Sequence, residues 1–174
     1  YDLPLESAMT ELAALAASLS PATEEDTQTS QALHRRVIGA NVRLRSPAGA
    51  DALARYVIDE SQLESLREIA LEALGAYSEP PLRDLTMGFY RPLAAADDEI
   101  LASVLRSLGR ALAESSLGGR AMEIATEKGE LPLDDEELVE LISDASGDLG
   151  ARVASLRALT SRAEVGQLSV DPAA

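Results

Sequence analysis

Residue types that carry chemistry are scarce in this chain. It has no cysteine, no tryptophan, one phenylalanine and one histidine, His34. The lack of cysteine excludes disulfides, thiolate metal sites, a cysteine nucleophile and covalent haem attachment within these residues. A metal site needs several converging ligands, and the single histidine is followed by Arg35 and Arg36. We therefore expect His34 to be a solvated side chain on a helix surface, or one that only supports a neighbouring group there, and we expect no metal site.

Positive charge is also scarce, with 15 basic against 30 acidic residues and a formal net charge of −15. This charge repels a phosphate backbone, so nucleic acids are not expected as partners. Membrane insertion is not expected either, because no run of about 18 apolar residues occurs. A P-loop, a G-x-S-x-G motif and a dinucleotide-binding glycine motif are all missing. The sequence predicts a protein that is not an enzyme and that holds no cofactor.

The residues that are abundant favour helices. Hydrophobic residues make up 46% of the chain but aromatic residues only 3%, so Leu, Ala, Ile and Val must build the core. Leu and Ala have high helix propensity, and Ala lets two backbones approach closely. The composition predicts an all-α protein.

Apolar residues recur at the three- and four-residue spacing of a helix along most of the chain. The predicted helices cover residues 4–19, 31–44, 47–59 and 61–77, and later ones begin near residues 97, 119, 131 and 148. The last of them presents Leu149, Val153, Leu156 and Leu159 as its apolar stripe. We expect an N-terminal helix and acidic loop over 1–27, a repeat domain over 28–164 and a flexible tail over 165–174.

Several predicted helix ends carry recognisable caps. The sequence Ser61-Gln62-Leu63-Glu64 has the capping-box arrangement, and Gly129 is placed to end a helix. Acidic runs occur at residues 24–26, 97–99 and 134–137. They could suggest a calcium site or paired acid–base carboxylates, but each lies at a predicted helix start, where it opposes the helix dipole. We therefore interpret these carboxylates as caps.

An internal repeat is visible in two motifs. Glu72-Ala73-Leu74-Gly75 and Arg106-Ser107-Leu108-Gly109 lie 34 residues apart, and each is predicted to close a longer helix. The run from Arg67 to Gly75 resembles the first helix of a HEAT repeat. This resemblance implies a HEAT-like α-solenoid, a right-handed superhelix of antiparallel helix pairs with about three to four repeats. A plain antiparallel bundle is the alternative.

Residues 78–96 interrupt the helical pattern, because Pro80, Pro81 and Pro92 forbid a continuous helical hydrogen-bond ladder. We predict an irregular insertion there. Its candidate interaction residues are Arg83, Asp84, Tyr90 and Arg91, since stiffened loops between rigid helices often present contact residues. In the alternative, Arg83 and Asp84 pair locally while Phe89 and Tyr90 fill a gap between helices.

The insertion also supports a narrower resemblance. The runs Leu74-Gly75-Ala76-Tyr77-Ser78-Glu79-Pro80-Pro81-Leu82-Arg83-Asp84 and Gly88-Phe89-Tyr90-Arg91-Pro92-Leu93 resemble the HEAT segment of large planctomycete-type proteins. Those proteins join a sorbosone-dehydrogenase-like propeller, helical repeats and a haem c domain. The resemblance implies a periplasmic or exported setting. This chain has neither the C-x-x-C-H haem motif nor propeller strands.

Two functions follow as expectations. The first is a non-catalytic scaffold, a piece of a larger protein, that contacts a partner protein or a neighbouring domain of its own polypeptide. The second is an accessory domain of a haem-containing oxidoreductase whose catalytic and haem domains lie outside these residues. A small-molecule-binding bundle is a third arrangement, but the even spacing of Ala and Leu shows no closed pocket.

Overall fold

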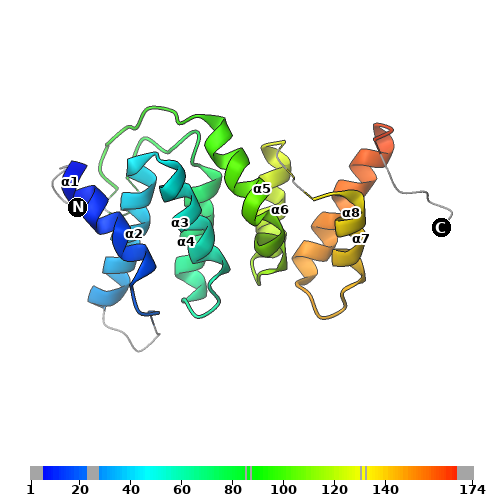
Figure 1. Cartoon of the computed structure of the whole chain (residues 1–174), viewed down its shortest axis with the longest axis horizontal. Helices are drawn as coiled ribbons and strands as arrows, with labels where there is room; N and C mark the ends of the chain where they lie inside the picture. Colours follow the sequence, from blue (N-terminus) through cyan, green and yellow to red (C-terminus); the bar gives the residue numbers. More distant parts are fainter. Residues whose placement is uncertain are drawn as a thin grey trace. The chain divides into compact units, whose positions relative to one another are not determined.

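A computed structural model describes residues 6–22, 28–84, 86, 88–129, 131 and 133–167. These residues form eight α-helices and one short 3-10 segment, η1 (Figure 1). In chain order they are α1 (Glu6–Ala14), η1 (Leu15–Ala17), α2 (Gln28–Leu44), α3 (Pro47–Ile58), α4 (Glu64–Gly75), α5 (Asp98–Glu114), α6 (Gly118–Glu127), α7 (Asp135–Ser143) and α8 (Leu149–Glu164). The predicted all-α class is confirmed, and most predicted helix bounds agree within a few residues.

The chain divides into two compact units, which we call unit 1 (Tyr1–Val104) and unit 2 (Leu105–Ala174). In unit 1, α1 packs along α2, α3 forms an antiparallel pair with α4, and α2 contacts both members of that pair (Figure 1). The large side chains fully buried there include Ile38, Leu53, Leu66, Leu74, Leu101 and Tyr77. The core of unit 1 is therefore largely aliphatic, and it also buries the ring of Tyr56.

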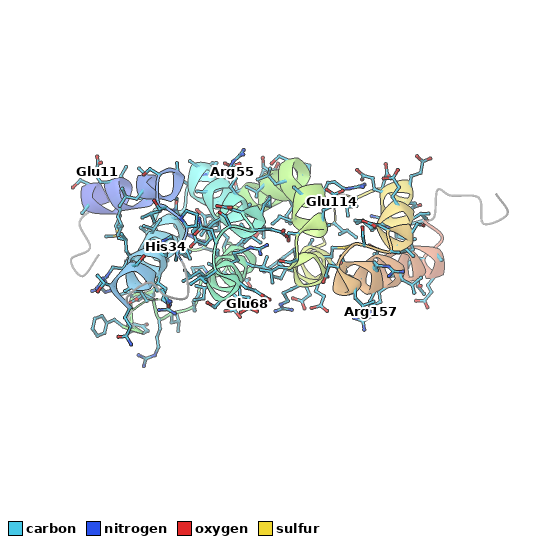
Figure 2. The ribbon with its side chains drawn as sticks, turned by 90° about the horizontal axis from the view of Figure 1, so that it is seen from below. Glu11, His34, Arg55, Glu68, Glu114 and Arg157 are labelled. Carbon is cyan, nitrogen blue, oxygen red and sulfur yellow. The ribbon has the colours of Figure 1, made fainter. Side chains whose placement is uncertain are left out.

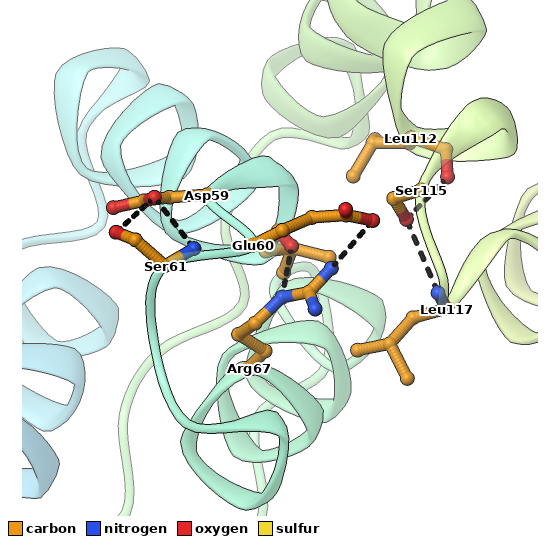
Figure 3. Close-up of polar contacts among 8 residues, drawn as sticks. Asp59, Glu60, Ser61, Arg67, Leu112, Ser115 and Leu117 are labelled. Atoms are coloured by element: carbon orange, nitrogen blue, oxygen red, sulfur yellow. Dashed lines mark hydrogen bonds and ion pairs between the residues drawn. The ribbon is translucent and has the colours of Figure 1, made fainter. Parts of the chain in front are cut away.

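Buried polar side chains join the helices of unit 1 through backbone carbonyls. The Asn41 amide nitrogen donates to the Ala13 carbonyl at 3.3 Å and to the Val37 carbonyl at 3.0 Å, which links α1 to α2. Arg67 of α4 is buried, and its Nε donates to the Val57 carbonyl at 2.7 Å in the last turn of α3 (Figure 3). A carbonyl that the helix itself cannot satisfy therefore gains a charged donor.

The capping box predicted at Ser61 is wrong. Helix α4 begins at Glu64, and its N-cap residue Leu63 makes no side-chain capping bond. The Ser61 hydroxyl instead donates to Asp59 Oδ1 at 2.5 Å, and the Ser61 backbone N–H donates to the same atom at 3.1 Å (Figure 3). The carboxylate two residues earlier competes successfully for the serine, because local Asx turns are favourable alternatives to a cap.

Unit 2 is built around α8, against which both α6 and α7 pack. Its core contains Ala113, Met122, Leu133, Leu138, Leu141, Ala151, Ala154 and Ala158. In the turn before α6, the Ser115 hydroxyl donates to the Leu112 carbonyl at 2.8 Å and accepts from the Leu117 backbone N–H at 3.3 Å (Figure 3). The backbones of α6 and α8 approach so closely that a Cβ added at Gly119 would lie 2.5 Å from the Gly150 carbonyl carbon.

This close approach reverses the predicted face of α8. Leu149, Val153 and Leu156 are exposed to solvent, at 69%, 39% and 57% of their surface, whereas Ala151, Ala154 and Ala158 face the core. Large side chains do not fit between backbones that nearly touch, so the small residues turn inward. The stripe predicted from hydrophobicity is therefore on the outside of α8, apart from the partly buried Leu159.

The two repeat motifs also differ in the structure. Gly75 is the last residue of α4, as predicted, but α5 continues past Gly109 to Glu114. The prediction that Gly109 closes a helix is wrong. A glycine costs a helix only about 1 kcal/mol relative to alanine, which tertiary packing of α5 overcomes.

Two other predicted ends have the expected geometry. Asp134 caps α7 in a complete capping box: its Oδ1 accepts from the Glu137 N–H at 2.8 Å, and Glu137 Oε2 accepts from the Asp134 N–H at 2.9 Å. Gly129, with φ of 71°, follows the end of α6. The acidic run at residues 24–26 lies outside the described residues.

Candidate functional site

The predicted insertion contains a small hairpin rather than an irregular loop. Arg83 and Tyr90 form an antiparallel β-bridge. Backbone hydrogen bonds run on both sides of it, from the Asp84 N–H to the Phe89 carbonyl and from the Arg91 N–H to the Leu82 carbonyl, each at 2.9 Å. All four predicted interaction residues therefore lie on paired backbone segments, with Asp84 next to the turn.

Asp84 organises the turn of this hairpin. Its Oδ1 accepts from the Thr86 N–H at 3.1 Å and its Oδ2 from the Phe89 N–H at 3.2 Å, while the side chain is almost fully buried. Asp and Asn hold turns in this way because a short carboxylate or amide reaches backbone N–H groups a few residues on. Arg83 supports the same turn, because its Nη1 donates to the Gly88 carbonyl at 2.8 Å.

The aromatic residues of the hairpin face solvent. Phe89 is 51% exposed, Tyr90 is 67% exposed, and neighbouring Leu82 is 60% exposed. They do not fill a gap between helices, which was the alternative prediction. The Arg91 guanidinium lies 5.4 Å from the centroid of the Phe89 ring, within cation–π range. We call the side chains of Leu82, Arg83, Phe89, Tyr90 and Arg91 on this hairpin the hairpin face.

The hairpin is held against α2. The Thr86 hydroxyl donates to the Arg35 carbonyl at 3.3 Å. Further along α2, a hollow separates the helix from the insertion, and its lining includes Arg43, Arg83, Arg91 and Asp84, with Pro80 and Pro81. We call it the arginine hollow. Its cavity volume of about 20 Å³ is room for roughly one water molecule.

Arg43 was not among the predicted site residues. It lies on α2, forty positions before Arg83, and only the folding of the insertion back onto α2 brings the two together. The one available signal was composition, since residues 28–47 contain four arginines and no acidic residue.

Arg45 fixes the base of the insertion. It directly follows α2 and has a φ of 50°, a left-handed conformation that is uncommon outside glycine. Its Nη2 donates to the Ser78 carbonyl at 3.1 Å, and its guanidinium lies 4.9 Å from the centre of the Tyr77 ring. Burial lowers the pKa of Arg45 below its usual value. Since the Ala96 N–H also donates to the Ser78 carbonyl, at 3.2 Å, the two ends of the insertion meet there.

The prediction of a solvated His34 is wrong. The side chain is only 1% exposed, and its Nδ1 is hydrogen-bonded to the Tyr56 hydroxyl at 2.7 Å. Figure 2 shows His34 within the body of unit 1, whereas Arg55 and Glu68 lie at its periphery. Burial raises the pKa of Tyr56. The pair is a buried link between α2 and α3, which the polar neighbours Arg35 and Arg36 concealed in the sequence.

Other kinds of site would need a cluster of metal ligands or a helix that can cross a membrane. Among the described residues, no group of three or more His, Asp or Glu side chains is placed to hold a metal ion. Over the same part of the chain, no helix combines the length and apolar character needed to cross a membrane.

Comparisons with known proteins identify no relative of this chain. Neither the family models, nor the curated proteins, nor the solved structures yielded a match to this chain.

Proposed function

We propose that this chain is a non-catalytic helical scaffold that binds a partner protein, or a neighbouring domain of its own polypeptide, through the hairpin face. The observation that carries the proposal is the placement of aromatic residues. The chain has five of them, and the only phenylalanine is exposed beside an exposed tyrosine on one short hairpin. Protein interfaces are enriched in Tyr, Phe and Arg, and all three occur on the hairpin face.

The way the hairpin is supported favours the same role. Its turn is fixed by Asp84, its base by Ser78 and its flank by the Arg35 carbonyl, so the exposed side chains stand on ordered backbone. A contact surface that is ordered before binding loses less conformational entropy when the partner binds. The proposal includes the finer arrangement of the helices as a HEAT-like array, because α3 and α4 form an antiparallel pair and α7 and α8 pack together.

The experiment compares capture of partners from source cells by three forms of the chain. The tested form carries Phe89→Ser with Tyr90→Ser, and the matched control carries Val165→Ser, which removes an equally exposed apolar side chain from unit 2. We expect a partner that wild type and control retain and that the hairpin variant loses by about tenfold or more, as for a hot-spot pair. A partner held equally by all three forms would contradict the proposal.

A charge-reversed variant tests the arginines of the same face. Arg83→Glu with Arg91→Glu is expected to weaken the contact with little loss of stability, since Arg83 is exposed and Arg91 is half-buried. Melting temperature is measured alongside binding. A large fall in melting temperature would assign these arginines to holding the hairpin together instead.

A further inference from the structure

Basic residues are concentrated where the hairpin lies along α2. Residues 28–47 and 80–93 contain six of the chain's 15 basic residues but only one of its 30 acidic residues, Asp84. The remainder of the chain is correspondingly more acidic. An anionic group is therefore repelled by most of this protein and attracted to this region.

The arginine hollow is the focus of that charge. Arg43, Arg83 and Arg91 contribute three positive charges to its lining, and Asp84 contributes one negative charge that already accepts two backbone N–H groups. The cavity is too small for a whole ligand, because small-molecule sites usually enclose about 300 to 1,000 Å³. It suits the tip of one oxygen-bearing group.

Arg43 has an unmet hydrogen-bonding requirement beside this hollow. Its Nη1 is buried and has no hydrogen-bond partner among the described residues. A buried charged donor without an acceptor is unfavourable, and an acceptor that carries negative charge offsets this cost best. An oxyanion that enters the arginine hollow would approach the guanidinium of Arg43 together with those of Arg83 and Arg91.

The surroundings indicate which source of oxyanion fits. The exposed apolar side chains Leu82, Phe89 and Tyr90 are sequence neighbours of Arg83 and Arg91, which line the hollow. A free inorganic anion would leave these apolar side chains in water, whereas a polypeptide can place an acidic side chain in the hollow and apolar side chains against the hairpin. Aromatic anchors around a charged contact are typical of protein interfaces.

We propose that the arginine hollow receives a carboxylate side chain of the partner, so that the partner presents an acidic segment with apolar neighbours to the hairpin face. This inference rests on the proposed function and specifies the chemistry of the partner. The guanidinium groups of Arg43 and Arg83 supply paired N–H donors from which a carboxylate can accept hydrogen bonds. Phe89 and Tyr90 shield this contact from water.

The experiment uses a fluorescently labelled, capped peptide of eight glutamates as the probe, with a peptide of eight glutamines as its neutral counterpart. Fluorescence anisotropy is recorded at low salt, about 20 mM, because screening weakens such contacts. We expect the glutamate peptide to bind the wild-type chain despite its net charge of −15, and the glutamine peptide to bind far more weakly.

Three variants locate the binding. Arg43→Gln and the double variant Arg83→Gln/Arg91→Gln are each expected to lower the affinity for the glutamate peptide by roughly tenfold or more. This is the loss expected when a charged hydrogen bond is removed. The matched control Arg120→Gln/Arg157→Gln removes two exposed arginines of unit 2 and should change affinity less than about twofold. If Arg43→Gln does not fold, Arg43→Lys retains the charge but not the fork and should still weaken binding.

Three results would overturn the inference. They are no binding of the glutamate peptide, an equal loss of affinity in the Arg120→Gln/Arg157→Gln control, or displacement of the bound glutamate peptide by inorganic phosphate at a concentration that leaves the ionic strength nearly unchanged. The carboxylate inference can fail while the proposed function holds. If a partner is lost with Phe89→Ser/Tyr90→Ser but retained with Arg43→Gln, the hairpin face is a contact surface, but the arginine hollow does not receive a carboxylate of that partner.

Discussion

Tyr77 shows how a single residue can tie distant segments together. Its hydroxyl donates to the Ser46 carbonyl at 2.9 Å and lies 3.3 Å from the Asn41 carbonyl, while Arg45 covers its ring. The side chain is fully buried. Burial raises the pKa of Tyr77, so the hydroxyl remains protonated and able to donate at neutral pH. The end of α2, the start of α3 and the insertion therefore depend on one ring.

Removal of this hydroxyl is expected to destabilise the chain. Tyr77→Phe leaves the ring in place but removes the hydroxyl donor from the Ser46 and Asn41 carbonyls, which should lower the free energy of unfolding by about 1 kcal/mol. Urea unfolding followed by far-UV circular dichroism measures the change. Tyr90→Phe is the control, because its exposed hydroxyl should matter by less than about 0.5 kcal/mol. Equal effects of the two substitutions would disagree with this role for Tyr77.

Asp59 should make stability depend on pH. The hydrogen bond from the Ser61 hydroxyl, then those from Gln62 and the Ser61 backbone, lower the pKa of this carboxyl in the folded chain, with a further contribution from Arg67. A lowered folded pKa gives stability that is present in full above the unfolded value near 3.9 and is lost as pH falls through the folded value. Because Asp59 is exposed, we expect less than about 1 kcal/mol.

The measurement compares Asp59→Asn with wild type at pH 7 and below pH 3. The variant should be less stable than wild type at the higher pH and nearly equal to it at the lower pH, where Asp59 itself is protonated. Glu68→Gln removes one exposed carboxylate elsewhere in unit 1 and corrects for the change in net charge (Figure 2). A stability difference that persists at low pH would show that the carboxylate charge is not the cause.

At the scale of elements, helix positions could be predicted from the sequence because the signals are local. A few neighbouring residues determine each of three helix ends: the start of α3 at Pro47, the cap of α7 at Asp134 and the end of α6 before Gly129. The inward face of α8 could not be predicted in this way. It is set by the approach of Gly119 to Gly150, two residues on different helices, and hydrophobicity alone favours the opposite face.

The candidate site, too, could be predicted from the sequence only where the signals are local. The prolines located the insertion, and Arg83, Tyr90 and Arg91 lie on the hairpin within it. Two features of the site could not be predicted, the structural role of Asp84 and the position of Arg43. Both depend on contacts that leave no pattern in the local sequence. The first is a turn of unforeseen geometry, and the second is a contact between residues far apart in the chain.

The cap of α7 provides a prediction for a single element. Asp134→Ala removes both a hydrogen bond to the first turn and a negative charge at the positive end of the helix dipole, and should cost about 1 kcal/mol. Thermal unfolding by circular dichroism detects the change. Ser61→Ala tests the alternative cap and should cost less, because Ser61 makes no bond to α4. A larger loss from Ser61→Ala would return the capping role to that serine.

At the scale of the whole molecule, every described tyrosine belongs to unit 1, and unit 2 contains no aromatic residue. Tyrosine fluorescence therefore reports on one unit and circular dichroism on both. Gly119→Ala would place a methyl group against the Gly150 backbone and should destabilise unit 2 by about 3 kcal/mol. We expect the dichroism transition to split or shift while the fluorescence midpoint stays close to that of wild type.

Arg120→Ala is the control for this experiment, because it changes the adjacent exposed residue and leaves the glycine contact intact. Equal shifts of both signals in Gly119→Ala would mean that the two units unfold as one cooperative body.

The outward stripe of α8 has a consequence for how molecules of this chain behave toward one another in concentrated solution. The exposed side chains of Leu149 and Leu156 favour apolar association between molecules, while a net charge of −15 makes the molecules repel one another. Added salt screens the repulsion and leaves the apolar association unaffected. Dynamic light scattering should show the particle radius growing with salt for wild type but not for Leu149→Glu/Leu156→Glu, so that ionic strength governs colloidal stability through one helix.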